Sequence, residues 1–178
     1  MAAADANGAN AVWKPNYVMV QHMDNAYNAN QVDSVGNYDC APTGLDSGDM
    51  VAGQIDNGIH LDSSTEYLDC GDIDELDSAG KYTISTWYKR NDSTGDHVYF
   101  GKGSSAANNM RTFIFNTSHY WFYPVNDSGI IHATDKHVDT DGHNLSLVFN
   151  GSGADNAERM QMYIEGAEEA VTYSGTIA

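Results

Sequence analysis

One aromatic run in this chain has the residue types that bind sugars. His119, Trp121 and Tyr123 alternate with Tyr120 and Phe122, and the polar residues Asn126 and Asp127 follow closely. A sugar ring presents C–H groups on its faces and hydroxyls at its edge, so it needs a flat aromatic surface beside amide or carboxylate groups. In a strand, one of the two alternating faces must be core. The ligand-binding candidates are therefore His119, Trp121, Tyr123, Asn126 and Asp127, with core packing as the alternative for each of them.

The densest acidic stretch has the residue types that bind a hard cation. Asp72, Asp74, Glu75 and Asp77 lie in a segment expected to join two strands. Calcium takes six to eight oxygen ligands, which a loop supplies from carboxylates and carbonyls. Asp72 and Asp74 are calcium candidates on this basis. The alternative is a solvated acidic surface, since no EF-hand spacing is present.

The motifs of the common enzyme classes are missing from the sequence. There is no Glu-x-Asp-x-x-Glu run, no Gly-x-Ser-x-Gly elbow, no phosphate-binding loop and no His-x-x-x-His pair. We therefore expect a binding protein without an organic cofactor, and catalysis is the least favoured function.

The charge balance narrows the range of partners. The chain carries 25 acidic and 8 basic residues, a formal net charge of −17. Nucleic acid and anionic lipid surfaces would be repelled. No run approaches the ~20 apolar residues of a membrane span, so neither nucleic acid nor an inserted membrane is an expected partner.

The first ten residues do not resemble an export signal, so we expect a signal already removed or an excised part of a longer protein.

Two sequence features favour an exported protein. Cys40 and Cys70 have no metal or redox spacing, which leaves a single disulfide as a candidate and its formation open. Asn-x-Ser/Thr triplets are glycosylation candidates, although about half of them could arise by chance in a chain of this composition. They begin at Asn91, Asn116, Asn126, Asn144 and Asn150.

Short strands separated by Gly, Asn, Asp and Ser indicate an all-β chain. Residues 1–11 have the composition of a linker, and the fold is expected to begin near Val12. Residues 82–89 form the clearest strand, in which we expect Trp87 to contribute to the core. The best helix candidate, residues 151–160, is weakened by its glycines. Further strands are expected at residues 17–23, 97–101, 111–116, 119–125, 144–149 and 160–164, and residues 55–61 and 67–70 are expected to form a hairpin-like pair.

The order of these segments resembles the laminin-G-like, concanavalin A-like lectin domains of large exported microbial proteins. The matching segments are residues 12–23, the Asp-Ser-x-Gly-Asn turn at 33–37, the hairpin at 53–72 before Ile-Ser-x-Trp at 84–87, and the stretches 145–151 and 162–166. The resemblance implies one antiparallel β-sandwich of the jelly-roll type over residues 12–178. It also adds Asp33 and Asp62 to the calcium candidates.

One departure from that family affects the expected function. The chain ends soon after residues 162–166, where such domains continue through further strands, and an incomplete sandwich exposes unpaired backbone groups. We expect a secreted or cell-surface module that binds glycan or glycoprotein, with calcium as a candidate cofactor. The alternative is a structural subunit of an extracellular filament or surface assembly, in which another copy donates the missing strand.

Overall fold

The computed structural model describes residues 13, 15–77, 79–91, 97–103, 110–115, 119–123, 130–134 and 140–177, with only the backbone given for some strand residues. Antiparallel strands dominate these residues, beside a 3-10 turn η1 (Asp74–Leu76) and a short helix α2 (Asn156–Arg159). No helix in the described part of the chain is both long and apolar enough to cross a membrane. The chain divides into two compact units, residues 1–75 and 76–178. The prediction of a linker at 1–11 lies outside the described residues, and that of a single domain over 12–178 stays a prediction.

The first unit contains two small two-stranded sheets. Strand β1 (Ala41–Thr43) pairs with β4 (Tyr67–Asp69), and β2 (Met50–Ala52) pairs with β3 (Asn57–Ile59). The expected hairpin between residues 55–61 and 67–70 was wrong, because each strand pairs with an earlier segment instead. The expected opening strand at 17–23 was also wrong. Only a bridge between Gln21 and Asp33 forms there, and Met23 at φ 59° leaves the extended backbone that a strand requires.

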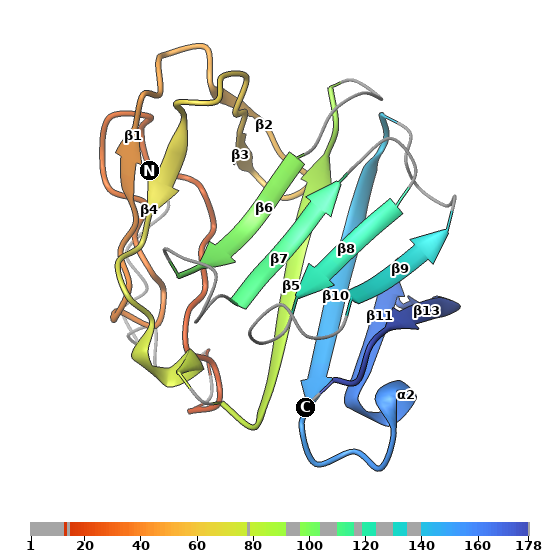
Figure 1. The fold of residues 1–178 in the computed structure, drawn as a ribbon. Coiled ribbons are helices and arrows are strands. Elements are labelled where there is room, and N and C mark those ends of the chain that lie inside the picture. The colour runs from red at the N-terminus through yellow and green to blue at the C-terminus, as the bar shows by residue number, and fades with distance from the viewer. Residues whose placement is uncertain are drawn as a thin grey trace. The chain divides into compact units, whose positions relative to one another are not determined.

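The second unit contains two larger antiparallel sheets (Figure 1). The four-stranded sheet has the order β12 (Ala167–Glu168), β11 (Met160–Ile164), β10 (Gly142–Asn150), β5 (Lys81–Lys89). The five-stranded sheet has the order β13 (Val171–Ser174), β9 (Ile130–Thr134), β8 (His119–Tyr123), β7 (Met110–Phe115), β6 (His97–Lys102).

The last part of the chain adds a strand to each larger sheet. Residues Glu165 and Gly166, at φ 52° and 76°, form a two-residue turn that returns the chain from β11 to β12. Such a turn needs two residues with positive φ, which Gly adopts without strain. Strand β13 then pairs with β9 in the other sheet. Two strands therefore follow residue 166, and the expectation that the chain lacks the last strands of a sandwich stays a prediction.

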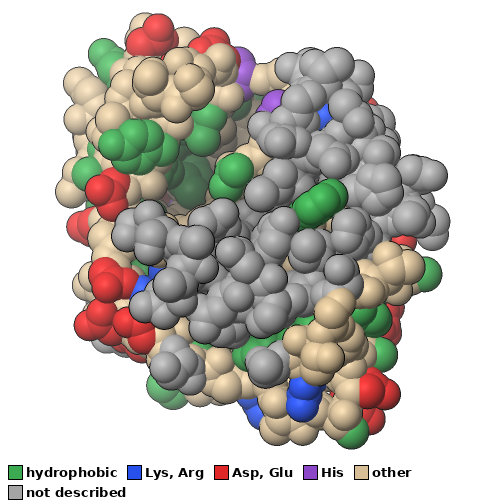
Figure 2. All heavy atoms as spheres, in the orientation of Figure 1, with side chains coloured by type: hydrophobic (Ala, Val, Ile, Leu, Met, Phe, Trp, Pro, Cys, Tyr) green, Lys and Arg blue, Asp and Glu red, His purple; other side chains and the backbone are tan. Residues whose placement is uncertain are grey.

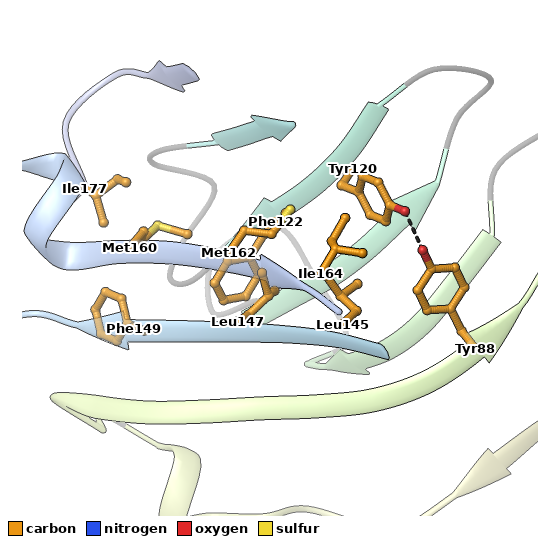
Figure 3. Close-up of a cluster of buried hydrophobic side chains, with 10 residues drawn as sticks. All are labelled: Tyr88, Tyr120, Phe122, Leu145, Leu147, Phe149, Met160, Met162, Ile164 and Ile177. Atoms are coloured by element: carbon orange, nitrogen blue, oxygen red, sulfur yellow. Dashed lines mark hydrogen bonds between the residues drawn. The ribbon is translucent and has the colours of Figure 1, made fainter. Parts of the chain in front are cut away.

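The core of the second unit draws side chains from both larger sheets (Figure 3). Strands β10 and β11 are aligned so that buried residues face each other across the ladder, as in Leu147 opposite Met162. Burying one such side chain contributes about 1.5–3 kcal/mol. The ten members are Tyr88, Tyr120, Phe122, Leu145, Leu147, Phe149, Met160, Met162, Ile164 and Ile177.

Strand β5 buries the face that does not carry its tryptophan. Tyr88 lies in the core and Ile84 packs against it, whereas Trp87 is 45% exposed. The expectation that Trp87 contributes to the core was wrong. Its position follows from the pairing with β10, since Thr86 lies opposite the buried Leu145 and Trp87 opposite Asn144.

Candidate functional site

The aromatic run at residues 119–123 forms β8, the central strand of the five-stranded sheet. Tyr120 and Phe122 are 1% and 0% exposed and belong to the core. Because successive side chains in a strand alternate between faces, Trp121 lies on the face away from that core. Trp121 is partly exposed. The run therefore has core residues on one face and Trp121 on the other, and the sugar-binding role of Trp121 stays a prediction.

Other predicted sugar-binding residues are only partly described. The backbones of His119 and Tyr123 lie in β8 beside Trp121, but their side chains are outside the described part of the structure. Asn126 and Asp127 lie outside the described residues. Their roles as ligand-binding residues stay predictions.

A row of paired positions crosses the five-stranded sheet through Trp121. Trp121 is opposite Ile114 of β7 and His132 of β9. Ile114 is in turn opposite Val98 of β6, which is 59% exposed, and His132 is opposite the exposed Thr172 of β13. The register between β7 and β8 shifts between Thr112 and Ile114, so paired positions do not keep to one face across the whole row. Trp121 is the central paired position of a row that ends at the exposed Val98 and Thr172.

A second exposed tryptophan lies on the outer face of the four-stranded sheet. Trp87 is opposite Asn144 of β10, and on the same face Ser146 donates a hydrogen bond to Ser85 across the strands at 2.9 Å. Short polar side chains therefore surround Trp87. Each of the two larger sheets thus carries one outward tryptophan, in different surroundings, which makes Trp87 a natural control for Trp121.

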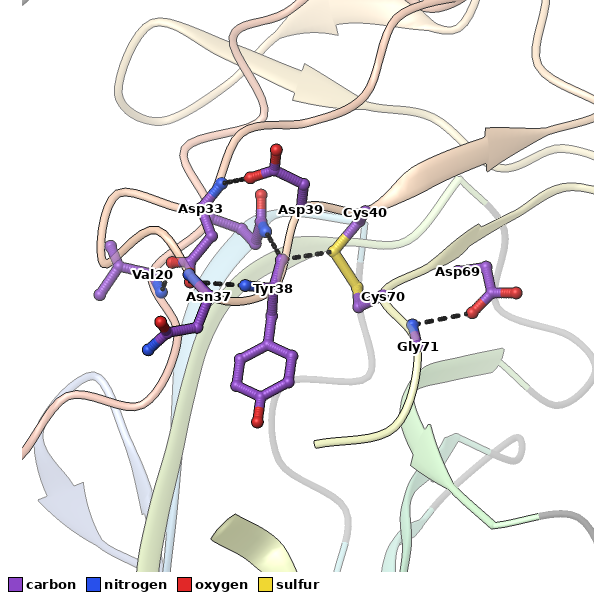
Figure 4. Close-up of a disulfide and its surroundings, with 10 residues drawn as sticks. Val20, Asp33, Asn37, Tyr38, Asp39, Cys40, Asp69, Cys70 and Gly71 are labelled. Carbon is purple, nitrogen blue, oxygen red and sulfur yellow. Dashed lines mark hydrogen bonds between the residues drawn. A yellow bond between two sulfur atoms is a disulfide. The ribbon is translucent and has the colours of Figure 1, made fainter. Parts of the chain in front are cut away.

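Cys40 and Cys70 form a disulfide in the first unit (Figure 4). Their Cα atoms are 3.9 Å apart, because Ala41 of β1 lies opposite Asp69 of β4 and the two cysteines are the next residues along each strand. Disulfides persist in oxidising compartments. The bond indicates an oxidising, extracytoplasmic environment for this chain.

Asp33 organises the loop beside this disulfide. Its carboxylate accepts hydrogen bonds from the backbone N–H groups of Val20, Val35, Asn37 and Tyr38 at 2.8–3.1 Å, partly visible in Figure 4. The residue is 2% exposed. Burial opposes its ionisation, but the four donors outweigh burial and place the pKa of Asp33 below its ordinary value. The observed role of this carboxylate is to fix the loop, and a role as a calcium ligand stays a prediction.

The remaining calcium candidates lie in two separate groups. Asp72 and Asp74 are exposed, and one carboxylate oxygen from each lies within 4.8 Å of one another and of a carboxylate oxygen of Asp77. Asp77 also forms an ion pair with Lys102 at 3.1 Å. Asp62 lies in another such group, with Asp49 and His60. Neither Asp49 nor His60 was predicted as a metal ligand from the sequence. The His-x-Asp spacing of residues 60 and 62, which places both on one face of an extended segment, was the available signal.

The face drawn in Figure 2 shows acidic side chains at several separate places rather than in one continuous patch. One of the described acids, Glu75, accepts a hydrogen bond from the Tyr38 hydroxyl. That bond and the nearby charge raise the pKa of Tyr38 above its ordinary value.

The glycosylation candidates differ in their local structure. Asn91 is exposed just after β5, while Asn144 and Asn150 are half-buried positions of β10. Asn150 accepts a hydrogen bond from the Ser152 hydroxyl of its own triplet. Asn116 and Asn126 lie outside the described residues.

Searches of protein-family models, curated proteins and solved structures found no match to this chain.

Proposed function

We propose that this chain is a secreted or cell-surface carbohydrate-binding module that binds glycan on the outer face of the five-stranded sheet. The observation that carries the proposal is the burial of Tyr120 and Phe122, which assigns Trp121 to the opposite face of the central strand. A partly exposed indole there offers a flat surface for the C–H groups of a sugar ring.

The surroundings of Trp121 suit an extended ligand. The row through Trp121 ends at the apolar Val98 on one side and at the hydroxyl-bearing Thr172 on the other. Glycans need both apolar contact and hydroxyl partners, and regular alternation along β8 would add positions 119 and 123 to this face. We propose Trp121 as the main stacking residue, with Asn126 and Asp127, which follow β8 in the sequence, as candidate polar partners.

The fold that we propose for the second unit is a laminin-G-like β-sandwich. Its two larger sheets share one core, and ring contacts such as Tyr82 with Phe122 connect β5 to β8. Sharing a core between the inner faces of two antiparallel sheets is the organising feature of sandwiches. The disulfide in the first unit supports an exported location.

A glycan array with three variants tests the proposed site. The full chain with its disulfide intact is screened with calcium and with a chelator, and the best ligand is then titrated. We expect Trp121→Ala to weaken binding by about tenfold or more, as for buried aromatic anchors. Trp121→Phe should retain part of the affinity, because it keeps an aromatic ring, and Trp87→Ala should bind like the wild type.

The controls separate a lost site from a lost fold. Circular dichroism and urea unfolding should show that Trp121→Phe remains folded even if Trp121→Ala does not. Equal affinity in wild type and both Trp121 variants would refute the proposed face. A blank array across neutral, acidic and sulfated glycans would refute glycan binding itself.

A second candidate is a subunit of an extracellular assembly, favoured by the unpaired edge of β5. This strand is nine residues long and pairs with β10 on one side, while no strand in the described part of the chain pairs with its other side. Long sheet edges bind further strands. Light scattering coupled to size exclusion tests this candidate. A concentration-dependent oligomer would support it, and a monomer at all concentrations would exclude it.

A further inference from the structure

The β2–β3 hairpin, labelled in Figure 1, brings together the ends of two strands that carry Asp49 and His60, eleven residues apart in the sequence. Met50 pairs with Ile59, and just beyond this pair the His60 backbone N–H donates to the Asp49 carbonyl at 2.8 Å. Asp62 follows two residues after His60. One donor atom from each of Asp49, His60 and Asp62 lies within 4.8 Å of the other two.

Asp49 is a buried carboxylate whose charge is not balanced by any described Lys or Arg. It is 3% exposed. One of its oxygens accepts the Asp46 backbone N–H at 2.6 Å, and among the described residues no other group donates to the carboxylate. A buried carboxylate is costly without a counter-charge, and a second carboxylate, Asp62, lies in the same group. A cation bound between the two carboxylates would supply the missing counter-charge.

The loop that carries Asp62 is held in place from outside the group. The Glu66 side chain accepts the backbone N–H groups of Asp62 and Ser63 at 2.7 and 3.0 Å. Glu66 therefore fixes the backbone at Asp62, while the hairpin ladder fixes Asp49 and His60. A site assembled before its ligand arrives needs less ordering on binding.

We propose that Asp49, His60 and Asp62 bind a zinc ion. An imidazole with two carboxylates is a donor set that zinc accepts, with the remaining position open to water or to a group from a partner. Calcium prefers six to eight oxygen ligands, which makes the imidazole a signal for a transition metal. At metal–ligand distances of about 2.0–2.2 Å, tetrahedral ligand atoms lie about 3.3–3.6 Å apart, so the three donor atoms need to approach one another by at most about 1.5 Å from the 4.8 Å bound on their present spacing.

Calorimetry of the full, disulfide-bonded chain with zinc chloride tests this site. We expect one zinc ion to bind with an affinity at least tenfold above that of calcium, and NMR signals of the His60 ring to shift on titration. Loss of a partner outside the direct ligand set often costs 10–100-fold in affinity, so His60→Ala should cost at least about tenfold. The matched control is His22→Ala, which removes an exposed histidine of the same unit and should leave zinc affinity unchanged.

Asp62→Asn provides a second ligand variant at an exposed position, where a loss of fold is not expected. Zinc affinity lowered by both His60→Ala and Asp62→Asn, with circular dichroism unchanged, would support the site. Equal zinc binding in His60→Ala and wild type would overturn it, as would the absence of any zinc binding. Calcium binding as tight as zinc and independent of His60 would also overturn it, because acidic surface groups would then account for the binding.

Discussion

Tyr88 of β5 and Tyr120 of β8 share a hydrogen bond between their hydroxyls inside the core of the second unit (Figure 3). Their rings also meet edge to face, with centroids 6.3 Å apart. The two residues belong to different sheets, so this pair fixes the position of one sheet against the other within an otherwise apolar cluster. Buried hydroxyls that are satisfied by each other specify one packing arrangement, because other arrangements leave them without that partner.

The first prediction concerns this pair. Tyr88→Phe and Tyr120→Phe each remove one hydroxyl and leave the ring in place, and each should lower the free energy of unfolding by about 1 kcal/mol or more. The double variant should be less destabilised than the sum of the two, with a coupling of about 0.5–1.5 kcal/mol. Urea unfolding of the four proteins measures the coupling. Strict additivity would show that the two hydroxyls do not stabilise each other.

The second prediction concerns the disulfide. The bond between Cys40 and Cys70 joins residues 30 positions apart, and closing a loop of that length restricts the unfolded chain. Replacing both cysteines with alanine should lower the stability of the first unit by about 3–4 kcal/mol. Thermal unfolding with and without reductant measures this. Reductant should have no effect on the double-alanine protein, and an equal effect on both proteins would point to another cause.

The third prediction concerns Asp33, whose pKa is lower in the folded protein than in the unfolded chain. The unfolded chain then binds more protons as the pH falls below about 4, so the stabilisation present at neutral pH is lost in that range. Asp33→Ala should cost about 2–4 kcal/mol at pH 7, because a buried carboxylate with four backbone donors is removed. Urea unfolding at several pH values checks both effects, and the exposed Asp24→Asn is the control. An unchanged acid profile in Asp33→Ala would contradict this role.

Strands with a strong alternating pattern could be predicted from the sequence. Residues 82–89, 144–149 and 160–164 lie within β5, β10 and β11 as expected. One face of each strand is buried against a shared core, so apolar residues recur at every second position. Strand β9 was missed because its adjacent Ile130 and Ile131 do not alternate.

The pairing of the strands and the choice of the buried face of each strand could not be predicted, because both depend on segments distant in the sequence. Nothing local distinguishes the Trp87 face of β5 from the Tyr88 face. The pairing with β10 determines which face is buried, because the buried Leu145 lies opposite Thr86. Likewise, Asp49 and His60 meet only because Met50 pairs with Ile59, and the short strand at 50–52 has no pattern of its own.

The last prediction concerns buried tyrosines at alkaline pH. Burial raises the pKa of Tyr82 and Tyr99 well above the ordinary value of about 10. Above that pH the unfolded chain loses these protons while the folded protein keeps them, so the free energy of unfolding falls as the pH rises. Absorbance of ionised tyrosine, followed beside circular dichroism, should show exposed tyrosines ionising first and these two only as the second unit unfolds. A Tyr82→Phe, Tyr99→Phe protein should retain more of its stability between neutral and alkaline pH than the wild type does. Complete tyrosine ionisation before any loss of structure would show that the two rings are accessible to water in the folded protein.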